Sequence, residues 1–450
     1  MARSETAVKF EMKFNRIALL CAVSALPVAA HAQQPGQPLG TPVPVQVQQQ
    51  PAPVAAEPAP LPPALWNVSD AQQLLTFIQG IRTEGLDPAD YDPAGLDAAL
   101  RSGNPMAMSQ AATDRFNRLS SDLALGHVRG KDRVDWTIKD PDLDGNRQDQ
   151  LLRWALQTHQ VAETLEGLRP THPQYAALKH ALEVTPATET AKINRIRLNM
   201  DRWRWLPQDL GQRYIIVNVP AYTAALVEKG ETISRHHAVA GKISTPTPQL
   251  SAVATGVILN PWWEIPSSIA GEVAGKKGFV ALKDDSGKVI RWRQPPGPTN
   301  ALGQVKFVMP KSKAIYLHDT NAKSRFNSKV RAFSHGCIRT QDILKLATIL
   351  LEEPAANADP AAAADSAKPW TAERIHDVLA SGKSVQASFA TALPVYIVYM
   401  SSAATVDGKI IDYQDIYKRD SRVIAALTDA SARTRDADRT AKSGDKVATR

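Results

Sequence analysis

Cysteine is almost absent from this chain, which has two in 450 residues, Cys21 and Cys337. Because Cys21 lies in an apolar N-terminal stretch typical of a cleaved leader, the mature chain would keep one thiol and could form no internal disulfide. A lone thiol in an oxidising compartment is a liability unless its reactivity is used. The count therefore excludes a fold held together by disulfides and makes Cys337 a candidate nucleophile.

Several patterns that mark common enzyme classes are also missing. The chain has no CxxC or HExxH spacing, so a zinc site is not expected. It has no glycine-rich phosphate loop, no dinucleotide fingerprint and no GxSxG nucleophile elbow. No apolar run is long enough to span a bilayer comfortably, and no internal repeat is evident. We therefore expect no metal, no cofactor and no transmembrane segment.

The overall composition is ordinary for a globular protein, with 43% hydrophobic and 22% charged residues. The length allows two or three domains. The net charge of +8 would suit an anionic polymer such as a cell wall. Because basic and acidic residues are mixed along the chain, charge alone identifies no partner and does not exclude nucleic acid. We expect no nucleic-acid partner.

Residues 1–32 have the pattern of an export signal. Met12 is a candidate initiator, and Lys13 and Arg16 supply the positive charge that such a signal begins with. An apolar run follows from Ile17 to Ala30, and residues 30–32 form a small-x-small cleavage site. The sequence therefore predicts an exported protein that is cleaved after residue 32.

The rest of the chain divides by composition. Residues 33–65 contain ten prolines and one charged residue, which predicts a disordered linker. Residues 66–190 have apolar positions at helical spacing and Asp-Pro pairs that can start helices. From 191 to 418, β-rich runs are separated by glycine and proline, and residues 419–450 are predicted to be a disordered tail.

The expected fold class is therefore α+β, a helical domain followed by a β-rich one. A stretch of about 262–303, rich in glycine, proline and tryptophan, is predicted to be a functional lid because structureless loops of that length are uncommon. The predicted strands are Tyr214–Val219, His236–Ala240, Val253–Leu259, Val305–Met309, Lys313–Leu317 and Val395–Met400. Helices are predicted at Asp342–Leu351 and from about Thr371 to Leu379.

Cys337 lies in the segment Ser334-His335-Gly336-Cys337-Ile338-Arg339. A thiol attacks as its thiolate, so it needs a base or a positive charge nearby. Gly336 lets the backbone turn tightly, so that neighbouring N–H groups can converge on one point. The segment indicates a nucleophile beside an anion-binding backbone.

Two histidines are candidates for the base. His318 ends the last predicted strand before Cys337 and lies nineteen residues upstream of it, a distance that a returning loop can close. His335 is nearer in sequence, but a residue two positions away usually points elsewhere when the chain turns between them. The pattern favours His318, with a packed or surface role as the alternative for either histidine.

The two motifs around His318 and Cys337 resemble the signature of the L,D-transpeptidase (YkuD-type) catalytic domain. Further segments resemble the large Gram-negative periplasmic subfamily, in which an α-helical scaffold domain precedes the catalytic domain: residues 202–207, 217–220, 239–242, 260–266, 300–303 and 316–320. The resemblance covers roughly residues 70–417. It implies a periplasmic protein whose catalytic domain is a mixed β-sandwich with short helices. The subfamily's small peptidoglycan-binding module has no counterpart near residues 170–200.

The resemblance also implies roles for the motif residues. Cys337 would be the nucleophile and His318 its base. The backbone carbonyl of Asp319 would orient the imidazole ring. The backbone N–H groups of His335, Gly336 and Cys337 would form an oxyanion hole.

Four other residues are candidates for substrate contact. Arg339 would grip a carboxylate through its planar guanidinium, with an ion pair to Asp342 as the alternative. Tyr316 shares a strand face with the predicted base by alternation, and Trp263 would cap the substrate from the lid; plain packing is the alternative for both. Ser334 is expected to shape the nucleophile loop.

The implied reaction is acyl transfer between peptidoglycan stem peptides, with no cofactor. The thiol would attack a tetrapeptide stem at its third residue, release D-alanine and pass the acyl group to an amine of a second stem, giving a 3→3 cross-link. Carbapenem β-lactams would be covalent inhibitors. Three alternatives stay open: hydrolysis at the same site, attachment or release of an outer-membrane lipoprotein, and a non-catalytic wall-binding protein.

Overall fold

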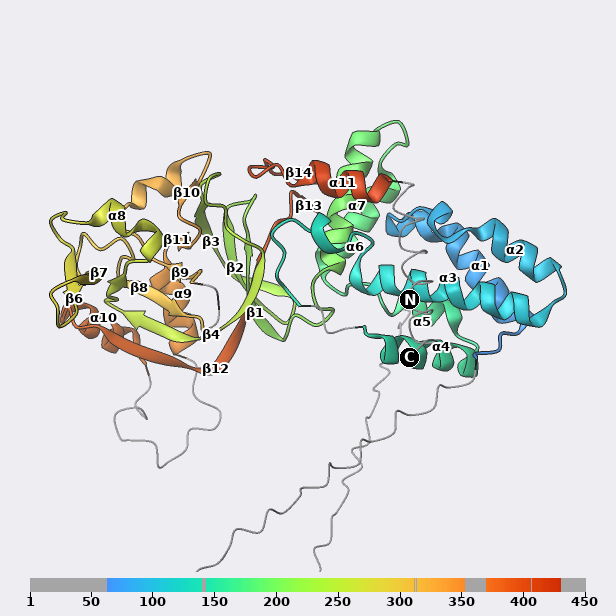
Figure 1. The fold of residues 1–450 in the computed structure, drawn as a ribbon, viewed down its shortest axis with the longest axis horizontal. Helices are drawn as coiled ribbons and strands as arrows, with labels where there is room; N and C mark the ends of the chain where they lie inside the picture. The colour runs from blue at the N-terminus through green and yellow to red at the C-terminus, as the bar shows by residue number, and fades with distance from the viewer. Residues whose placement is uncertain are drawn as a thin grey trace, which may run out of the picture. The chain divides into compact units, whose positions relative to one another are not determined.

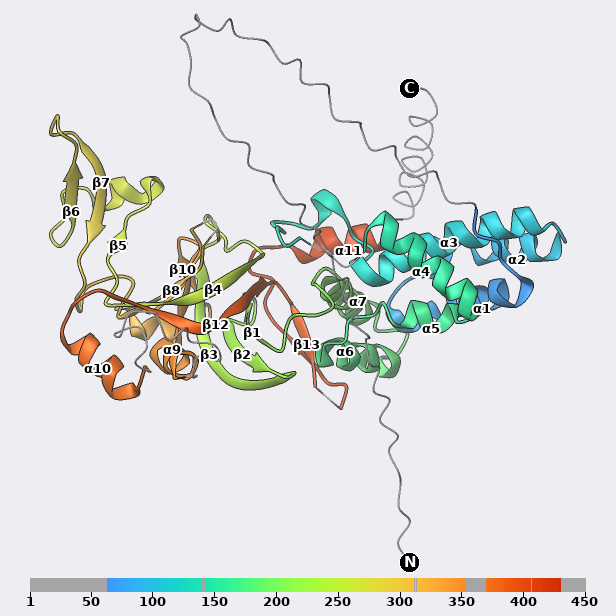
Figure 2. The same ribbon diagram turned by 90° about the horizontal axis from the view of Figure 1, so that it is seen from below.

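The computed structural model describes residues 63–139, 143–310, 312, 314–352, 370–405 and 407–429 (Figures 1 and 2). The predicted export signal and nearly all of the proline-rich linker lie outside the described residues. Among the residues described, no helix is long and apolar enough to cross a membrane.

The first part of the described chain is helical, as predicted. Its helices up to residue 166 share one apolar core, and the helix that follows contributes to a second cluster. Its α-helices are α1 (Val68–Gly80), α2 (Pro93–Arg101), α3 (Pro105–Leu125), α4 (Gly145–Thr158), α5 (Val161–Glu166) and α6 (Pro173–Val184). Short 3-10 turns occupy Ile81–Glu84, Pro88–Tyr91 and Gly130–Asp132.

Side-chain caps explain where these helices begin. The Asn67 side chain accepts a hydrogen bond from the N–H of Asp70 at 2.7 Å and so caps α1. Asp87 and Asp92 are each followed by proline. As predicted, they cap the 3-10 turn Pro88–Tyr91 and helix α2, respectively. Helix α7 (Thr190–Arg204) then leads into the β-rich part.

The β-rich part is built on one nine-stranded mixed sheet with the order β10-β3-β11-β9-β8-β4-β12-β1-β2. Strand β3 pairs with β2 as well as with β11, so the sheet closes on itself. Its strands are β1 (Arg213–Asn218), β2 (Thr223–Glu228), β3 (Glu231–Gly241), β4 (Leu250–Leu259), β8 (Val305–Val308), β9 (Leu317–His318), β10 (Ala332–Ser334), β11 (Ile338–Thr340) and β12 (Val385–Val398). The predicted α+β class is confirmed.

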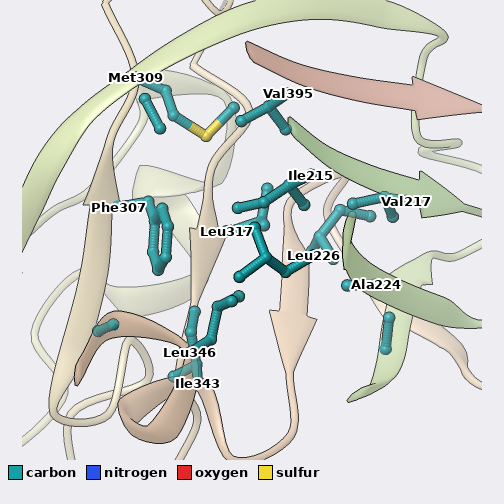
Figure 3. Packing of buried hydrophobic residues seen from close by; sticks show 14 of the residues in the cluster. Ile215, Val217, Ala224, Leu226, Phe307, Met309, Leu317, Ile343, Leu346 and Val395 are labelled. Carbon is teal, nitrogen blue, oxygen red and sulfur yellow. The ribbon is translucent and has the colours of Figure 1, made fainter. Parts of the chain in front are cut away.

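Alternate residues of these strands form the largest core. Ile215, Leu226, Phe307 and Val395 lie together in it (Figure 3). Helix α9 (Ile343–Leu351) adds its apolar face to the same cluster, and α10 (Ala372–Ala380) adds Ile375. Burial of this kind stabilises the fold by roughly 25 cal/mol per Å² of apolar surface removed from water.

One predicted strand is much shorter than expected. Of the predicted run Lys313–Leu317, the described residues are 314–317, and among these only Leu317 belongs to a strand, the two-residue β9. Ala314 has a left-handed backbone, with φ of +61°, and the N–H of Ile315 donates to the carbonyl of Ser312 at 3.0 Å. The chain turns there, because a left-handed residue cannot continue an extended strand.

The predicted lid, about residues 262–303, is a small subdomain rather than an open loop. It contains the sheet β5-β7-β6, formed by Trp263–Glu264, Val289–Gln294 and Val280–Lys283. A 3-10 turn (Ser267–Ile269) and α8 (Ala270–Val273) complete it (Figure 2). Its own apolar cluster includes Ile265 and Ile269.

The predicted disordered tail from Arg419 onward is wrong in its first ten residues. After the hairpin β13 (Ser402–Ala404) and β14 (Ile410–Asp412), the chain forms α11 (Asp420–Thr428). Val423 and Leu427, one helical turn apart, are buried in a cluster with residues of the helical domain. Two apolar residues on one face suffice to dock a short helix, although the segment as a whole is polar. Residues 430–450 lie outside the described residues.

An ion pair anchors α11. Arg202 of α7, almost fully buried, lies 2.8 Å from a carboxylate oxygen of Asp420, and its guanidinium also contacts the hydroxyl of Ser401 at 3.2 Å. Removing one partner of a buried pair leaves an uncompensated charge inside the protein, which strongly destabilises the folded state.

We therefore expect Asp420→Asn to lower the free energy of unfolding by about 3 kcal/mol, measured by urea denaturation. The matched control is Asp97→Asn, which breaks an exposed pair with Arg101 and should cost about 0.5 kcal/mol or less. Equal effects of the two substitutions would contradict a docked α11.

Candidate active site

Two short parallel strands bring the predicted nucleophile and base together. In the pairing of β11 with β9, Ile338 lies opposite Leu317 and Arg339 lies opposite His318. Ile338 and Leu317 are fully buried in the core. Because side chains alternate between the faces of a strand, Cys337, Arg339 and His318 lie on the opposite face of this pair. Thiol and imidazole therefore share one face of adjacent strands.

The loop before Cys337 depends on Gly336. Its φ is +116°, which L side chains rarely adopt, and a Cβ there would lie 3.1 Å from the Cδ1 of Ile315. The hydroxyl of Ser334 closes the loop by donating to the carbonyl of Cys337 at 2.6 Å and accepting from the N–H of Gly336 at 3.1 Å. Ser334 thus shapes the loop from inside.

These hydrogen bonds correct one expectation. The N–H of Gly336 is already used by Ser334, so the expected oxyanion hole loses one of its three donors. Among the residues that the structure describes, the N–H groups of His335 and Cys337 have no hydrogen-bond acceptor. They are the two donors that remain for an oxyanion.

His318 is buried and held in one orientation. Its Nδ1 lies 2.5 Å from the backbone carbonyl of Asp319. A carbonyl can only accept, so Nδ1 carries the proton and Nε2 of the neutral ring keeps its lone pair. Burial lowers the pKa of His318 to about 3, and the positive charge of Arg339 acts in the same direction. His318 is therefore a neutral imidazole whose Nε2 carries a lone pair.

The thiol of Cys337 is also neutral at rest. Its Sγ donates to the carbonyl of Ala314 at 3.4 Å. Burial raises the pKa of Cys337 above the usual thiol range, while a hydrogen bond from the backbone of Tyr316 and the charges of Lys306 and Arg339 oppose that shift. The resting pair is thus thiol and imidazole, and ionisation of the thiol must accompany its attack.

Lys306 is a site residue that the sequence did not reveal. It lies opposite His318 in the pairing of β8 with β9. Its Nζ is 3.9 Å from the centre of the Tyr316 ring. Burial lowers the pKa of Lys306, and the Cys337 thiolate would raise it. The alternation of side chains along β8 could have revealed Lys306 as a site residue. Lys306 lies between the buried Val305 and Phe307, so it faces the other side of the strand.

Arg339 is a second cation on this face. Burial lowers the pKa of its guanidinium, and the nearby charge of Arg325 adds to the effect. The predicted alternative, an ion pair with Asp342, does not occur, and no carboxylate within the described ranges pairs with Arg339. A half-buried cation without a carboxylate partner is suited to an anionic ligand group.

His335 points away from the thiol toward the subdomain of residues 262–303. Its Nε2 lies 3.2 Å from a carboxylate oxygen of Glu272 in α8. Trp263 packs within the same subdomain, with its ring 6.3 Å from that of Phe279. Of the two histidines, His318 is therefore the one that shares a strand face with Cys337, and the ring of Trp263 packs within the subdomain.

A cavity of about 480 Å³ lies among residues of β8 and of the turn that precedes β9. Its lining includes Lys306, Tyr316 and Ala314, whose carbonyl accepts from the Cys337 sulfur. This size is within the usual range for ligand pockets. In the described part of the chain, no group of three or more His, Cys, Asp or Glu side chains is placed to share a metal ion.

Two family models match this chain. Residues 212–381 match the L,D-transpeptidase catalytic domain (YkuD). Residues 63–182 match the Scaffold domain. The chain therefore carries a Scaffold domain followed by a YkuD-type L,D-transpeptidase catalytic domain. The domain boundaries of 66–190 and 191–418 stay predictions, since the matches cover shorter ranges.

The relatives of this chain are distant in sequence. A putative L,D-transpeptidase of Haemophilus influenzae is 28% identical over 305 residues, which are 61% of this chain and 59% of that protein. This chain thus spans 59% of the length of that relative. Solved structures include an L,D-transpeptidase from Mycobacterium smegmatis, 14% identical over 42% of this chain and 58% of its own, with a TM-score of 0.21. L,D-transpeptidase 3 from Mycobacterium tuberculosis is 12% identical over 42% and 61%, with a TM-score of 0.22. Scores this low support no further argument.

The electrostatics of the site predict the pH dependence of Cys337. The rate at which the thiol reacts with iodoacetamide should rise with pH. The midpoint of this rise should lie above the usual thiol pKa, because burial disfavours the thiolate. Lys306→Met removes a charge that stabilises the thiolate, so it should move the midpoint to still higher pH and slow alkylation several-fold at pH 7. Mass spectrometry of the Cys337 peptide measures both effects.

The matched control for this charge is Lys277→Met, since Lys277 is exposed on the subdomain. It should leave the alkylation profile unchanged. A profile of Lys306→Met that coincides with that of the parent would show that the ammonium does not act on the thiol.

Proposed function

We propose that this protein is a peptidoglycan L,D-transpeptidase in which Cys337 is the nucleophile and His318 the base. The observation that carries the proposal is the placement of a thiol and an oriented, neutral imidazole on one face of the paired strands β9 and β11. The family match to the catalytic domain supports the same reaction class.

The first half-reaction forms an acyl-enzyme. The sulfur of Cys337 attacks the carbonyl of the third residue of a tetrapeptide stem while Nε2 of His318 takes the thiol proton. The N–H groups of Cys337 and His335 donate to the oxyanion that develops on the attacked carbonyl. The C–N bond to the terminal D-alanine then breaks, and His318 returns the proton to the leaving amine.

The second half-reaction transfers the acyl group. An amine of a second stem attacks the thioester, and His318 accepts a proton from it. The C–S bond breaks, the sulfur regains a proton from His318, and a 3→3 cross-link is released. Water in place of the amine would give a carboxypeptidase, so the acceptor decides the outcome.

The cations of the site fit a substrate that carries carboxylates. Arg339 faces the thiol side of β11 without a carboxylate partner within the described residues, and Lys306 lines the adjacent cavity. Stem peptides present such groups at their third and fourth residues. We propose that Arg339 binds one of them bidentately.

The proposed location is the periplasm. The predicted export signal, residues 1–32, and the proline-rich linker, residues 33–65, precede the Scaffold match, an arrangement that suits a wall enzyme held at the end of a tether. Cell-wall synthesis, and through it cell shape, would be the process served.

The proposal is tested by incubating the purified protein with a disaccharide-tetrapeptide and separating the products by mass spectrometry. We expect a cross-linked dimer that has lost one D-alanine. Cys337→Ala should give no dimer while keeping the unfolding midpoint of the parent. A tripeptide as the sole product would show a hydrolase, and no product from the parent would overturn the proposal.

The role of Arg339 gives a separate prediction. Arg339→Gln should lower kcat/KM for the tetrapeptide by roughly 10- to 100-fold, the value of a hydrogen bond to a charged group. Arg291→Gln, at an exposed position of the subdomain, is the matched control and should retain the parent rate. A rate for Arg339→Gln equal to that of this control would exclude carboxylate binding by Arg339.

A further inference from the structure

A second loop, residues 241–247, packs against the loop of residues 334–337 and forms hydrogen bonds with its backbone. The hydroxyl of Thr247, which is fully buried, donates to the carbonyl of Gly336 at 2.8 Å and accepts from the N–H of Gly241 at 2.9 Å. The N–H of Lys242 donates to the carbonyl of Ser334 at 2.9 Å. The two loops approach so closely that a Cβ on Gly241 would lie 3.1 Å from the Cα of Gly336.

The hydrogen bond to Gly336 has a consequence for the proposed oxyanion hole. The carbonyl of Gly336 and the N–H of Cys337 belong to one peptide group, which is planar with the two bonds pointing in opposite directions. Holding the carbonyl therefore also sets the direction of the N–H. Ser334 restrains the N–H of Gly336 itself, and Thr247 restrains the carbonyl of Gly336.

We propose that Thr247 is a positioning residue that aims the N–H of Cys337 at the oxyanion. The inference rests on the proposed acyl transfer at Cys337. Thr247 touches no reacting atom. Its hydroxyl acts through the peptide group between Gly336 and Cys337.

The C-terminal segment holds Thr247 in place. The hydroxyl of Tyr417 donates to the carbonyl of Gly241 at 2.6 Å and accepts from the N–H of Thr247 at 3.2 Å, so it joins both ends of the loop. Arg419, only 2% exposed, donates to the carbonyl of Thr247 at 3.2 Å and pairs with Asp135. Tyr417 and Arg419 lie beyond residue 381, where the match to the catalytic domain ends.

Two reactions of Cys337 separate positioning from general damage. Iodoacetamide alkylates the thiolate by displacing iodide from a saturated carbon, so no oxyanion forms. A carbapenem acylates the same sulfur through a tetrahedral oxyanion, after which the ring C–N bond breaks and the nitrogen takes a proton. A misdirected Cys337 N–H slows the second reaction and leaves the first unchanged.

The experiment measures both rates in the full chain, together with the thermal unfolding midpoint. Thr247→Val keeps the shape and removes the hydroxyl, and we expect acylation to slow about tenfold or more at an unchanged alkylation rate. Thr247→Ser keeps the hydroxyl and should restore acylation to near the parent rate. Tyr417→Phe should slow acylation by a smaller factor. Thr232→Val, an exposed position of the same β3 strand that ends at Gly241, is the matched control.

Acylation of Thr247→Val at the parent rate overturns the inference, and so does an equal loss of acylation and alkylation. If Thr247→Val does not fold, Tyr417→Phe decides, and parent-like acylation of that variant overturns the inference. A parent protein that is alkylated but never acylated overturns the proposed function instead, and the two failures are therefore distinguishable.

Discussion

The parallel pairing of β9 with β11 is the constraint on which the site depends. Leu317 and Ile338 are buried side by side in the core of the closed sheet, and this burial fixes the register. A shift by one residue would turn the side chain of His318 or Arg339 into the apolar core in place of Leu317 or Ile338. The same hydrophobic contact that stabilises the sheet therefore brings thiol, imidazole and guanidinium to one face.

Burial also sets the chemistry of that face. Desolvation keeps His318 neutral and raises the pKa of Cys337, while Lys306 and Arg339 favour the thiolate. At neutral pH the resting group is therefore the thiol and not the thiolate.

The loops behind the site show how parts distant in sequence support one backbone. Gly336 is restrained by Ser334 within its own loop and by Thr247 from the loop after β3. Thr247 is restrained in turn by Tyr417 and Arg419, near the end of the described chain. The backbone around Cys337 is therefore held by a network of hydrogen bonds to which Tyr417 and Arg419 of the C-terminal segment contribute.

Local signals in the sequence predicted much of this structure. Asp87 and Asp92 before prolines marked helix starts, and the motifs around His318 and Cys337 indicated the family. Contacts between distant segments could not be read in this way. The docking of α11 rests on Val423 and Leu427 against another domain, and the role of Thr247 rests on a loop that only the folded sheet brings to Gly336. The turn at Ala314 was missed because a left-handed backbone is usually marked by glycine or asparagine, and this position is an alanine.

The central claim is that thiol and imidazole are both neutral in the resting protein. ¹⁵N NMR of the His318 ring tests it most directly. The account predicts a neutral ring with the proton on Nδ1 from pH 5 to pH 8, the same in the parent and in Cys337→Ala. A charged imidazolium at pH 7 that becomes neutral in Cys337→Ala would show a preformed ion pair and contradict the account.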